Sequence, residues 1–217
     1  EEMDNLLLVA SSNPYYFTLF TLAKTTGRRL GEFYGVEEKE KIGTKVIGKK
    51  KVYSNEGKQI EVDKTRDVFK ATGKFKLGLK GKDFVEQMDK NLIMKTWVLK
   101  RRNYVQDETY LNKATSDVVK KYLKANKIKD DDYVFRQKSY RAIQNAVSNY
   151  GKKAGIKKKV SFHSFRHYFV THLLKQGWSH NEVAKVTGHK SVASVGAYDH
   201  VLSKDLKNKL DEALESS

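Results

Sequence analysis

The last third of the chain carries a spaced set of residues that could together cleave a phosphodiester. They are His163, Arg166, the pair Gly188-His189, and Tyr198. A tyrosine hydroxyl can attack phosphorus and form a covalent intermediate, and a guanidinium can hold phosphate oxygens bidentately without pH dependence. The set therefore predicts phosphodiester chemistry on a tyrosine nucleophile, with no metal ion taking part.

Tyr198 needs assistance, because a free tyrosine has a pKa near 10 and only about one molecule in a thousand is phenolate at neutral pH. His163 lies three residues before Arg166, so both side chains are expected on one side of a helix start. It could accept the proton of Tyr198 or hydrogen-bond the phosphate. Tyrosines and histidines are more often structural, but the interval from His189 to Tyr198 favours the functional interpretation.

Four motifs together resemble the tyrosine recombinases, the phage-type integrases and their relatives. The segment His163–His167 (HSFRH) is similar to their HxxR motif, and Gly188-His189 is similar to their GH pair. Tyr198 stands in a YxH setting, and Thr26–Glu32 (TGRRLGE) is similar to TGxRxxE. The four motifs follow one another with the family's intervals, so the resemblance covers essentially the whole chain as a catalytic domain.

Within the upstream motif the resemblance selects Arg29 over Arg28 as the partner of Arg166 in holding the phosphate. Glu32 is expected to pair with Arg29 and so to orient a catalytic arginine. Arg28 is expected to contact the DNA backbone or to lie in solvent. The leucine that usually precedes the GH pair is replaced here by Thr187.

The leaving 5′-oxygen of deoxyribose needs a proton, and the family supplies it from a lysine on a β-hairpin. Lys100, at the end of an expected strand over residues 92–99, is the first choice. Lys95 is the second, and Lys80 and Lys82 remain alternatives. A general acid of this kind contributes about a hundred- to ten-thousandfold in rate.

The resemblance implies site-specific recombination, integration or excision, through a covalent 3′-phosphotyrosyl intermediate. It implies double-stranded DNA as the substrate, a homo-tetramer on two DNA sites, and no metal, ATP or other cofactor. Two alternatives remain: DNA relaxation like that of a type IB topoisomerase, and a DNA-binding module without catalysis. His163, His167 and His172 do not form a recognised metal-ligand pattern.

The composition favours a polyanionic partner. The chain of 217 residues has a formal net charge of +17 and a pI of about 9.7, and phosphate contacts dominate nucleic-acid binding. It has no cysteine, so disulfides and thiolate metal sites are excluded. No apolar run is long enough to cross a bilayer. We therefore expect a cytoplasmic, DNA-associated protein without membrane contact.

Periodicity predicts a mainly α-helical fold with a small antiparallel β-sheet, that is, α+β. The sheet is expected as a hairpin of strands 92–99 and 104–111, joined by residues 100–103. Helices are expected at 3–10, 15–24, 115–125, 139–154, from 161 or 163 to 177, 180–188, 192–198 and, on a leucine stripe, 202–214.

Residues 36–87 differ from the rest of the chain and are expected to be an insertion in the catalytic domain 1–217. From Val36 to Lys82 there are fourteen lysines and arginines against seven acidic residues. We expect short strands and exposed turns there, with a hairpin tip at Ser54–Gly57. The segment is either a flexible surface insertion or a basic flap on the DNA backbone, and it most resembles archaeal integrases of plasmids and viruses. The core-binding domain that usually precedes the family's catalytic domain is absent from this chain.

Overall fold

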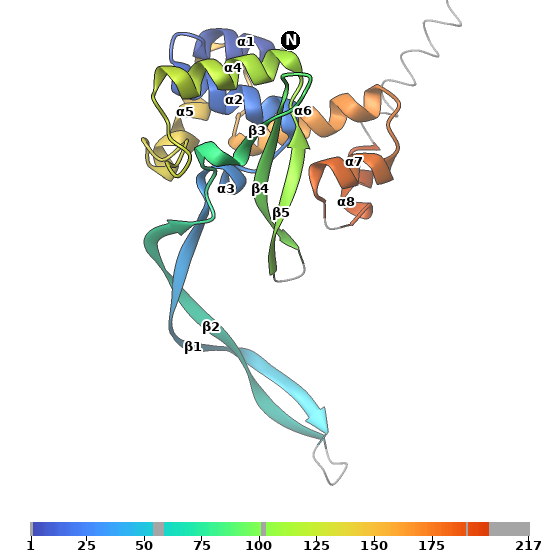
Figure 1. The fold of residues 1–217 in the computed structure, drawn as a ribbon. Helices are drawn as coiled ribbons and strands as arrows, with labels where there is room; N and C mark the ends of the chain where they lie inside the picture. Colours follow the sequence, from blue (N-terminus) through green and yellow to red (C-terminus); the bar gives the residue numbers. More distant parts are fainter. Residues whose placement is uncertain (1, 54–58, 101–102, 190, 200–217) are drawn as a thin grey trace, which may run out of the picture. The chain divides into compact units, whose positions relative to one another are not determined.

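The computed structural model describes residues 2–53, 59–100, 103–189 and 191–199. The chain divides into two compact units (Figure 1). The larger contains Glu1–Gly35 and Leu77–Ser217, and the smaller contains Val36–Lys76. The predicted hairpin tip at Ser54–Gly57 and the predicted helix at 202–214 lie outside the described residues.

The larger unit is built mainly from helices whose ends follow ordinary capping chemistry. Asn13 accepts a hydrogen bond from the Tyr16 amide at the start of one helix, and Ser139 accepts one from Ala142 at the start of another. The helices are α1 (Glu2–Ala10), α2 (Pro14–Thr26), α3 (Leu30–Tyr34), α4 (Lys113–Ala125), α5 (Tyr140–Lys153), α6 (Phe162–Lys175), α7 (His180–Thr187) and α8 (Ala193–Gly196).

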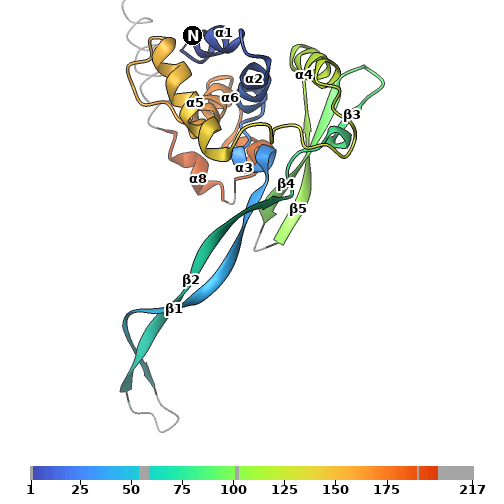
Figure 2. The ribbon, with the colours of Figure 1, turned by 90° about the vertical axis from the view of Figure 1, so that its left-hand side faces the viewer.

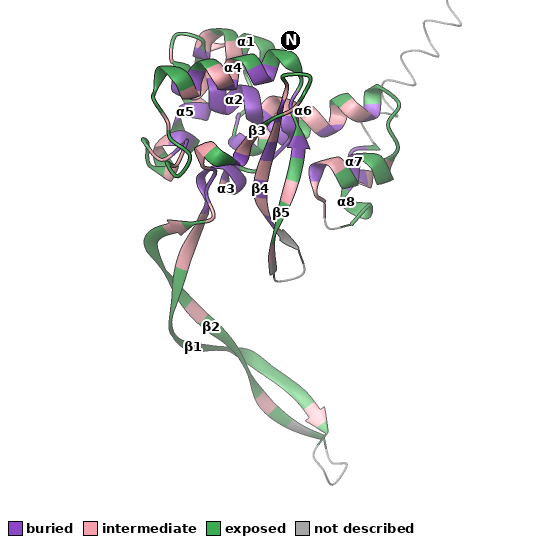
Figure 3. Ribbon diagram, viewed as in Figure 1, coloured by how far each residue is buried: buried purple, intermediate pink, exposed green. Residues whose placement is uncertain are grey.

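Helix α2 is the centre of the core and contacts α1, α4 and α6. Leu19, Phe20 and Leu22 of this helix are fully buried, and Phe20 packs on Phe165 of α6 with ring centroids 5.3 Å apart. Residues 18–23 of α2 are all buried, and Figure 3 shows much of this helix coloured as buried. Burial of such side chains contributes roughly 1.5–3 kcal/mol each, so the α2–α6 contact is a rigid base for the residues that follow both helices.

A three-stranded antiparallel sheet completes the larger unit, in the order β3 (Phe84–Glu86), β4 (Leu92–Lys100), β5 (Asn103–Tyr110). Along β4 the even-numbered residues Leu92, Met94, Thr96 and Val98 are buried, while the odd-numbered ones between them are only half-buried. This alternation is typical of a sheet with one face on the core. The prediction of a mixed α+β fold with a small antiparallel sheet is confirmed.

The smaller unit is a two-stranded antiparallel ribbon, seen from two sides in Figures 1 and 2. Its strands, β1 (Val36–Tyr53) and β2 (Gln59–Lys76), have 18 residues each. The sequence predicted short strands and an insertion reaching residue 87; the ribbon ends at Lys76, and residues 77–87 belong to the larger unit. Strand length depends on cross-strand pairing, which local composition does not reveal.

Candidate active site

Gly27 turns the chain from α2 directly into the two arginines. It has a φ of +63°, in the left-handed region, and its amide donates to the Ala23 carbonyl. A Cβ at this position would lie 2.5 Å from Cδ1 of Phe169 on α6. Only glycine lets α2 and α6 approach this closely while the backbone reverses, so Arg28 and Arg29 emerge beside α6.

The structure corrects the expectation for Arg28, which is 1 % exposed rather than solvated or on DNA. Its Nη2 donates to Oδ2 of Asp107 at 2.8 Å and to Oγ1 of Thr109 at 2.7 Å. Its Nη1 lies 3.8 Å from Oε1 of Glu32. Asp107 and Thr109 are on β5, so Arg28 ties the sheet to the start of α3. Burial is tolerated because carboxylates neutralise the guanidinium.

Arg29 is exposed and is the N-cap residue of α3. Its charge lowers the pKa values of His163, Arg166 and His189, and it opposes the burial-driven rise in the pKa of Tyr198. Arg29 therefore lies among the predicted site residues.

Glu32 contacts the backbone of Arg29 and the side chain of Arg28. Its Oε2 accepts a hydrogen bond from the backbone amide of Arg29, and its Oε1 faces Arg28. It thus fixes the backbone of Arg29 at the start of α3. Among the described residues, the side-chain ion pair of Glu32 is with Arg28, and no guanidinium–carboxylate pair with Arg29 is found.

Arg166 projects from α6 and is 1 % exposed. Its Nη1 donates to the Gly27 carbonyl at 2.9 Å and to the Thr187 carbonyl at 2.7 Å, joining the ends of α2 and α7. Among the described residues, Nε and Nη2 have no hydrogen-bond partner although they are buried. Burial and the nearby charge of Arg29 lower the pKa of Arg166 to about 10, so this cation has too few acceptors around it.

His189 follows α7, which ends at Gly188 with a φ of +66°. Its Nδ1 is hydrogen-bonded to the hydroxyl of Thr187, which is fully buried and also donates to the Val183 carbonyl. Burial, together with the charges of Arg166 and Arg29, lowers the pKa of His189 to about 4. His189 is therefore neutral at physiological pH, and Thr187 fixes the orientation of its ring.

Tyr198 is 8 % exposed and packs with Val170, Leu174, Val183 and Val195. Burial raises its pKa, and the charges of Arg166 and Arg29 act in the opposite direction. The Oδ1 atom of the neighbouring Asp199 lies 2.5 Å from Nε2 of His180, at the start of α7. The segment that carries Tyr198 thus contacts α7 twice, through the packing of the tyrosine ring on Val183 and through the contact of Asp199 with His180.

A row of three rings connects the HxxR segment to the tyrosine. The centroid of His163 lies 4.9 Å from that of His167, and the His167 centroid lies 5.2 Å from that of Tyr198. Burial lowers the pKa of both histidines, and the Arg166 charge lowers them further. Both are neutral at pH 7, so either can accept a proton.

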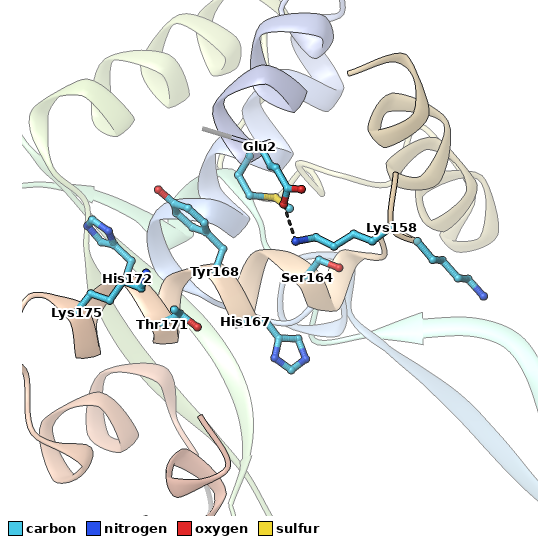
Figure 4. Close-up of a pocket in the computed structure, with 10 residues that line it drawn as sticks. Glu2, Lys158, Ser164, His167, Tyr168, Thr171, His172 and Lys175 are labelled. Atoms are coloured by element: carbon cyan, nitrogen blue, oxygen red, sulfur yellow. Dashed lines mark ion pairs between the residues drawn. The ribbon is translucent and has the colours of Figure 1, made fainter. Parts of the chain in front are cut away.

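A pocket beside α6 lies next to this site and shares only His167 with it (Figure 4). In the pocket, Lys158 pairs with Glu2 at 2.5 Å, and His172 stacks on Tyr168 with centroids 5.8 Å apart. His172 is therefore engaged away from His163. Among the described residues, no three His, Cys, Asp or Glu side chains gather in a way that could hold a metal ion.

The four candidate lysines lie in different surroundings. Lys100 is the last residue of β4 and pairs with Asn103; its side chain lies outside the described part of the chain. The Nζ of Lys95 is 3.5 Å from Oε1 of Glu108. Lys80 and Lys82 both face Asp131, at 3.6 and 2.7 Å. Three of the four are thus held by a carboxylate.

With this geometry established, comparison with known proteins decides the family. A sequence profile of the phage integrase family matches residues 78–205. The chain belongs to the phage integrase family. The matched segment includes His163, Arg166, His189 and Tyr198, whereas Arg29 lies before it.

Individual tyrosine recombinases of the family are similar over part of their length. Tyrosine recombinase XerA of Saccharolobus solfataricus is 27 % identical over 143 residues, which are 64 % of this chain and 47 % of that protein. XerA of Pyrococcus furiosus is 33 % identical over 103 residues, or 44 % and 35 % of the two chains. This chain therefore spans about half, or less, of the relatives it matches.

Solved structures of tyrosine recombinases share the fold. A crystal structure of XerA recombinase superposes with a TM-score of 0.65 at 22 % identity, covering 98 % of this chain and 61 % of that one. XerH bound to its palindromic difH substrate, in a post-cleavage complex, gives 0.64 at 16 % identity, covering 97 % and 51 %. The fold class predicted from the integrase motifs is that of these recombinases.

The sequence did not predict the roles of three residues of the site. His167 was considered only as a metal ligand, although its spacing of four from His163 places both rings on one side of α6. Thr187 was treated as a minor replacement, and nothing local shows that it holds His189. The role of Arg28 depends on β5, about 80 residues further on, so no local signal could have found it.

Proposed function

We propose that this integrase-family chain cleaves and rejoins double-stranded DNA through a covalent bond to Tyr198. The observation that carries the proposal is the environment of Arg166, which has buried donors without partners and lies close enough to Arg29 and Tyr198 for their charges to shift its pKa. An unsatisfied buried guanidinium is costly unless it has an anionic partner. A DNA phosphate is the anion that a neighbouring tyrosine would attack.

The reaction follows from the groups present. Arg166 and Arg29 would hold the non-bridging oxygens, whose charge grows toward the pentavalent transition state. The Tyr198 oxygen would form a bond to phosphorus while the bond from phosphorus to the 5′-oxygen breaks. The products are a 3′-phosphotyrosine and a free 5′-hydroxyl, and reversal of the step by another strand's 5′-hydroxyl rejoins the DNA without ATP.

The proton of Tyr198 passes to a neutral histidine. His163 was the predicted acceptor, and the lowered pKa values of His163 and His167 suit both to this role. His167, whose ring packs against that of Tyr198, is a second candidate acceptor beside His163. His189 would donate to a phosphate oxygen in the tautomer that carries the proton on Nε2, with the Thr187 hydroxyl then donating to Nδ1 in place of the Val183 carbonyl.

We retain Lys100, the first choice from the sequence, as the general acid for the 5′-oxygen. The even-numbered residues 92–98 of β4 are buried on the core face. Thr109 of β5, which accepts a hydrogen bond from Arg28, lies on the same face, because it is the cross-strand neighbour of Met94. Lys95 belongs to the odd series and is paired with Glu108.

The partners implied for the whole protein belong to the same proposal. XerH was solved on its difH substrate, and by analogy we propose site-specific recombination on duplex DNA by a homo-tetramer, in the cytoplasm. Residues 1–217 would supply the catalytic domain. Among the described residues, no helix is long and apolar enough to cross a membrane.

Covalent trapping on DNA tests the proposal. Wild type and Tyr198→Phe are incubated with supercoiled plasmid in EDTA and stopped with detergent. We expect a protein–DNA adduct with wild type alone. An adduct with both proteins would show that the nucleophile is another residue, and adduct formation that requires added Mg²⁺ would refute the metal-free mechanism.

Exchange between two marked duplexes then separates the two enzymatic alternatives. A recombinase transfers a strand from one duplex to the other, whereas a type IB topoisomerase only relaxes its own substrate. Relaxation without exchange, in the presence of a genuine recombination site, would favour the topoisomerase.

A further inference from the structure

The ribbon Val36–Lys76 has two faces that can be assigned from its strand register. On β2, residues 59–71 pair without a break, whereas β1 has register shifts that leave Ile42 and Ile47 as bulge residues. Side chains alternate between faces along a strand. The even-numbered residues of β2 therefore share one face with their β1 partners, and the odd-numbered residues share the other.

The odd face carries Glu61, Asp63 and Asp67, and lysines of the same face neutralise two of these carboxylates. Lys41 pairs with Asp67 at 2.8 Å, and Lys49 lies 3.9 Å from Glu61. Lys51 stands directly opposite Glu61. We call this the paired face. Its lysines have local carboxylates and are poor candidates for binding a further anion.

The even face, which we call the cation face, has the opposite character. Between residues 40 and 70 it carries one acidic residue, Glu40, next to five cations. Among the residues that the structure describes, no ion pair involves any of these five. They are Lys45, Lys50, Lys64, Arg66 and Lys70.

This arrangement does not stabilise the ribbon on its own. Lys45 lies directly opposite Arg66, and like charges in opposing positions are destabilising. A two-stranded hairpin without a third strand or a core is marginally stable at best in water. The repulsion between the like charges of the cation face is therefore relieved only if an anion binds to that face.

We propose that the cation face of the ribbon binds the sugar-phosphate backbone of duplex DNA, separately from the active site. This proposal rests on the proposed function, which makes DNA the substrate. A twisted two-stranded ribbon is one of the elements that a major groove admits, and bulges increase such twist. Contacts to phosphate need cations without competing carboxylates.

The distribution of apolar side chains argues against a membrane surface as the partner. The large exposed apolar residues of the ribbon are Val46, Tyr53 and Phe69 on the paired face and Ile42 and Ile47 at the bulges. A membrane-binding element combines apolar and basic residues so that the apolar side is buried in lipid while the cations meet the headgroups. Here, the exposed large apolar side chains that the structure describes are not on the cation face, where Val52, Val62 and Val68 are half-buried.

Matched triple variants of the full chain test the assignment. The cation-face variant is Lys45→Gln, Lys64→Gln, Arg66→Gln. The paired-face control is Lys41→Gln, Lys49→Gln, Lys51→Gln, with the same loss of three charges. Affinity for a duplex of arbitrary sequence is measured against salt concentration.

Each phosphate contact contributes about 0.9 to the slope of log K against log salt. Loss of three contacts should lower the slope by about 2.7, and the affinity ratio between 50 and 200 mM salt should shrink by about 40-fold relative to wild type. The control should change the slope by less than one contact. Equal slopes in the two variants would overturn the proposal.

Two further measurements separate this proposal from others. Covalent adduct formation on the same preparations reports on the active site, so adduct without a slope difference refutes the ribbon contact alone. A slope difference without any wild-type adduct would keep the ribbon contact and refute the catalytic proposal. Loss of binding to phosphatidylserine vesicles, with an unchanged DNA slope, would assign the cation face to a membrane and overturn the inference.

Discussion

Neighbouring Arg28 and Arg29 should respond in opposite ways to the same substitution. Arg28→Met removes a guanidinium that is 1 % exposed and bonded to Asp107 and Thr109. Arg29→Met removes an exposed one. The first change should reduce stability, and the second should reduce chemistry while the fold is kept.

The magnitudes follow from the contacts. Breaking a buried ion pair by removing one partner costs about 3–5 kcal/mol. The lower end applies to Arg28, because the Asp107 side chain is 24 % exposed and methionine refills part of the space. Arg29→Met should change stability by no more than about 0.5 kcal/mol, but loss of a transition-state contact should slow cleavage by about 10²–10³-fold.

Urea unfolding and adduct formation measure the two effects on the same proteins. With a slope of about 2 kcal/mol per M, a loss of 3 kcal/mol moves the midpoint by about 1.5 M. Asp107→Asn is the control for the ion pair, since it should cost less on the Arg28→Met background than on wild type. A stable but inactive Arg28→Met, with an active Arg29→Met, would refute this division of roles.

Three other outcomes are expected. Adduct formation should hold its rate down to about pH 6.5 and fall below it, because the lowered pKa of His163 keeps the proton-accepting neutral form populated; an acid limb centred above 6.5 would contradict this. Thr187→Val should free the ring of His189 and slow cleavage about tenfold or more. Nitrogen NMR would report the tautomer of His189, and Thr187→Ser should retain both the wild-type tautomer and the wild-type cleavage rate. Lys100→Ala should lose about 10²–10⁴-fold on ordinary DNA and recover on a 5′-bridging sulfur substrate, whose thiolate needs no proton; no recovery would point to another acid.

Local signals were enough for those parts of the site that lie on single helices. The HxxR segment begins a helix after Ser161, and the GH pair follows the left-handed cap at Gly188. Both features depend on residues within a few positions of each other, so spacing predicts them. The placement of Tyr198 next to α7 also follows from short connections between helices.

Other parts could not be predicted because long-range pairing decides them. The TGxRxxE motif selects Arg29, but the buried, structural role of Arg28 depends on Asp107 and Thr109 on β5. The extent of the ribbon is set by pairing between residues 36 and 76, with glycines at the bulges. Composition could show that this segment was basic, but not that Glu61, Asp63 and Asp67 share one face.

The two buried arginines show how the fold separates stability from anion binding. Arg28 is neutralised by carboxylates of its own chain, so its burial holds the sheet to α3. Arg166 is equally buried, but among the described residues its hydrogen bonds go only to the carbonyls of Gly27 and Thr187. These carbonyls fix the guanidinium without cancelling its charge, and the segments that carry Arg29 and His189 are fixed with it. Burial and the Arg29 charge lower the pKa of Arg166 to about 10, and a bound phosphate is the partner that would stabilise the charged guanidinium where charge develops in the reaction.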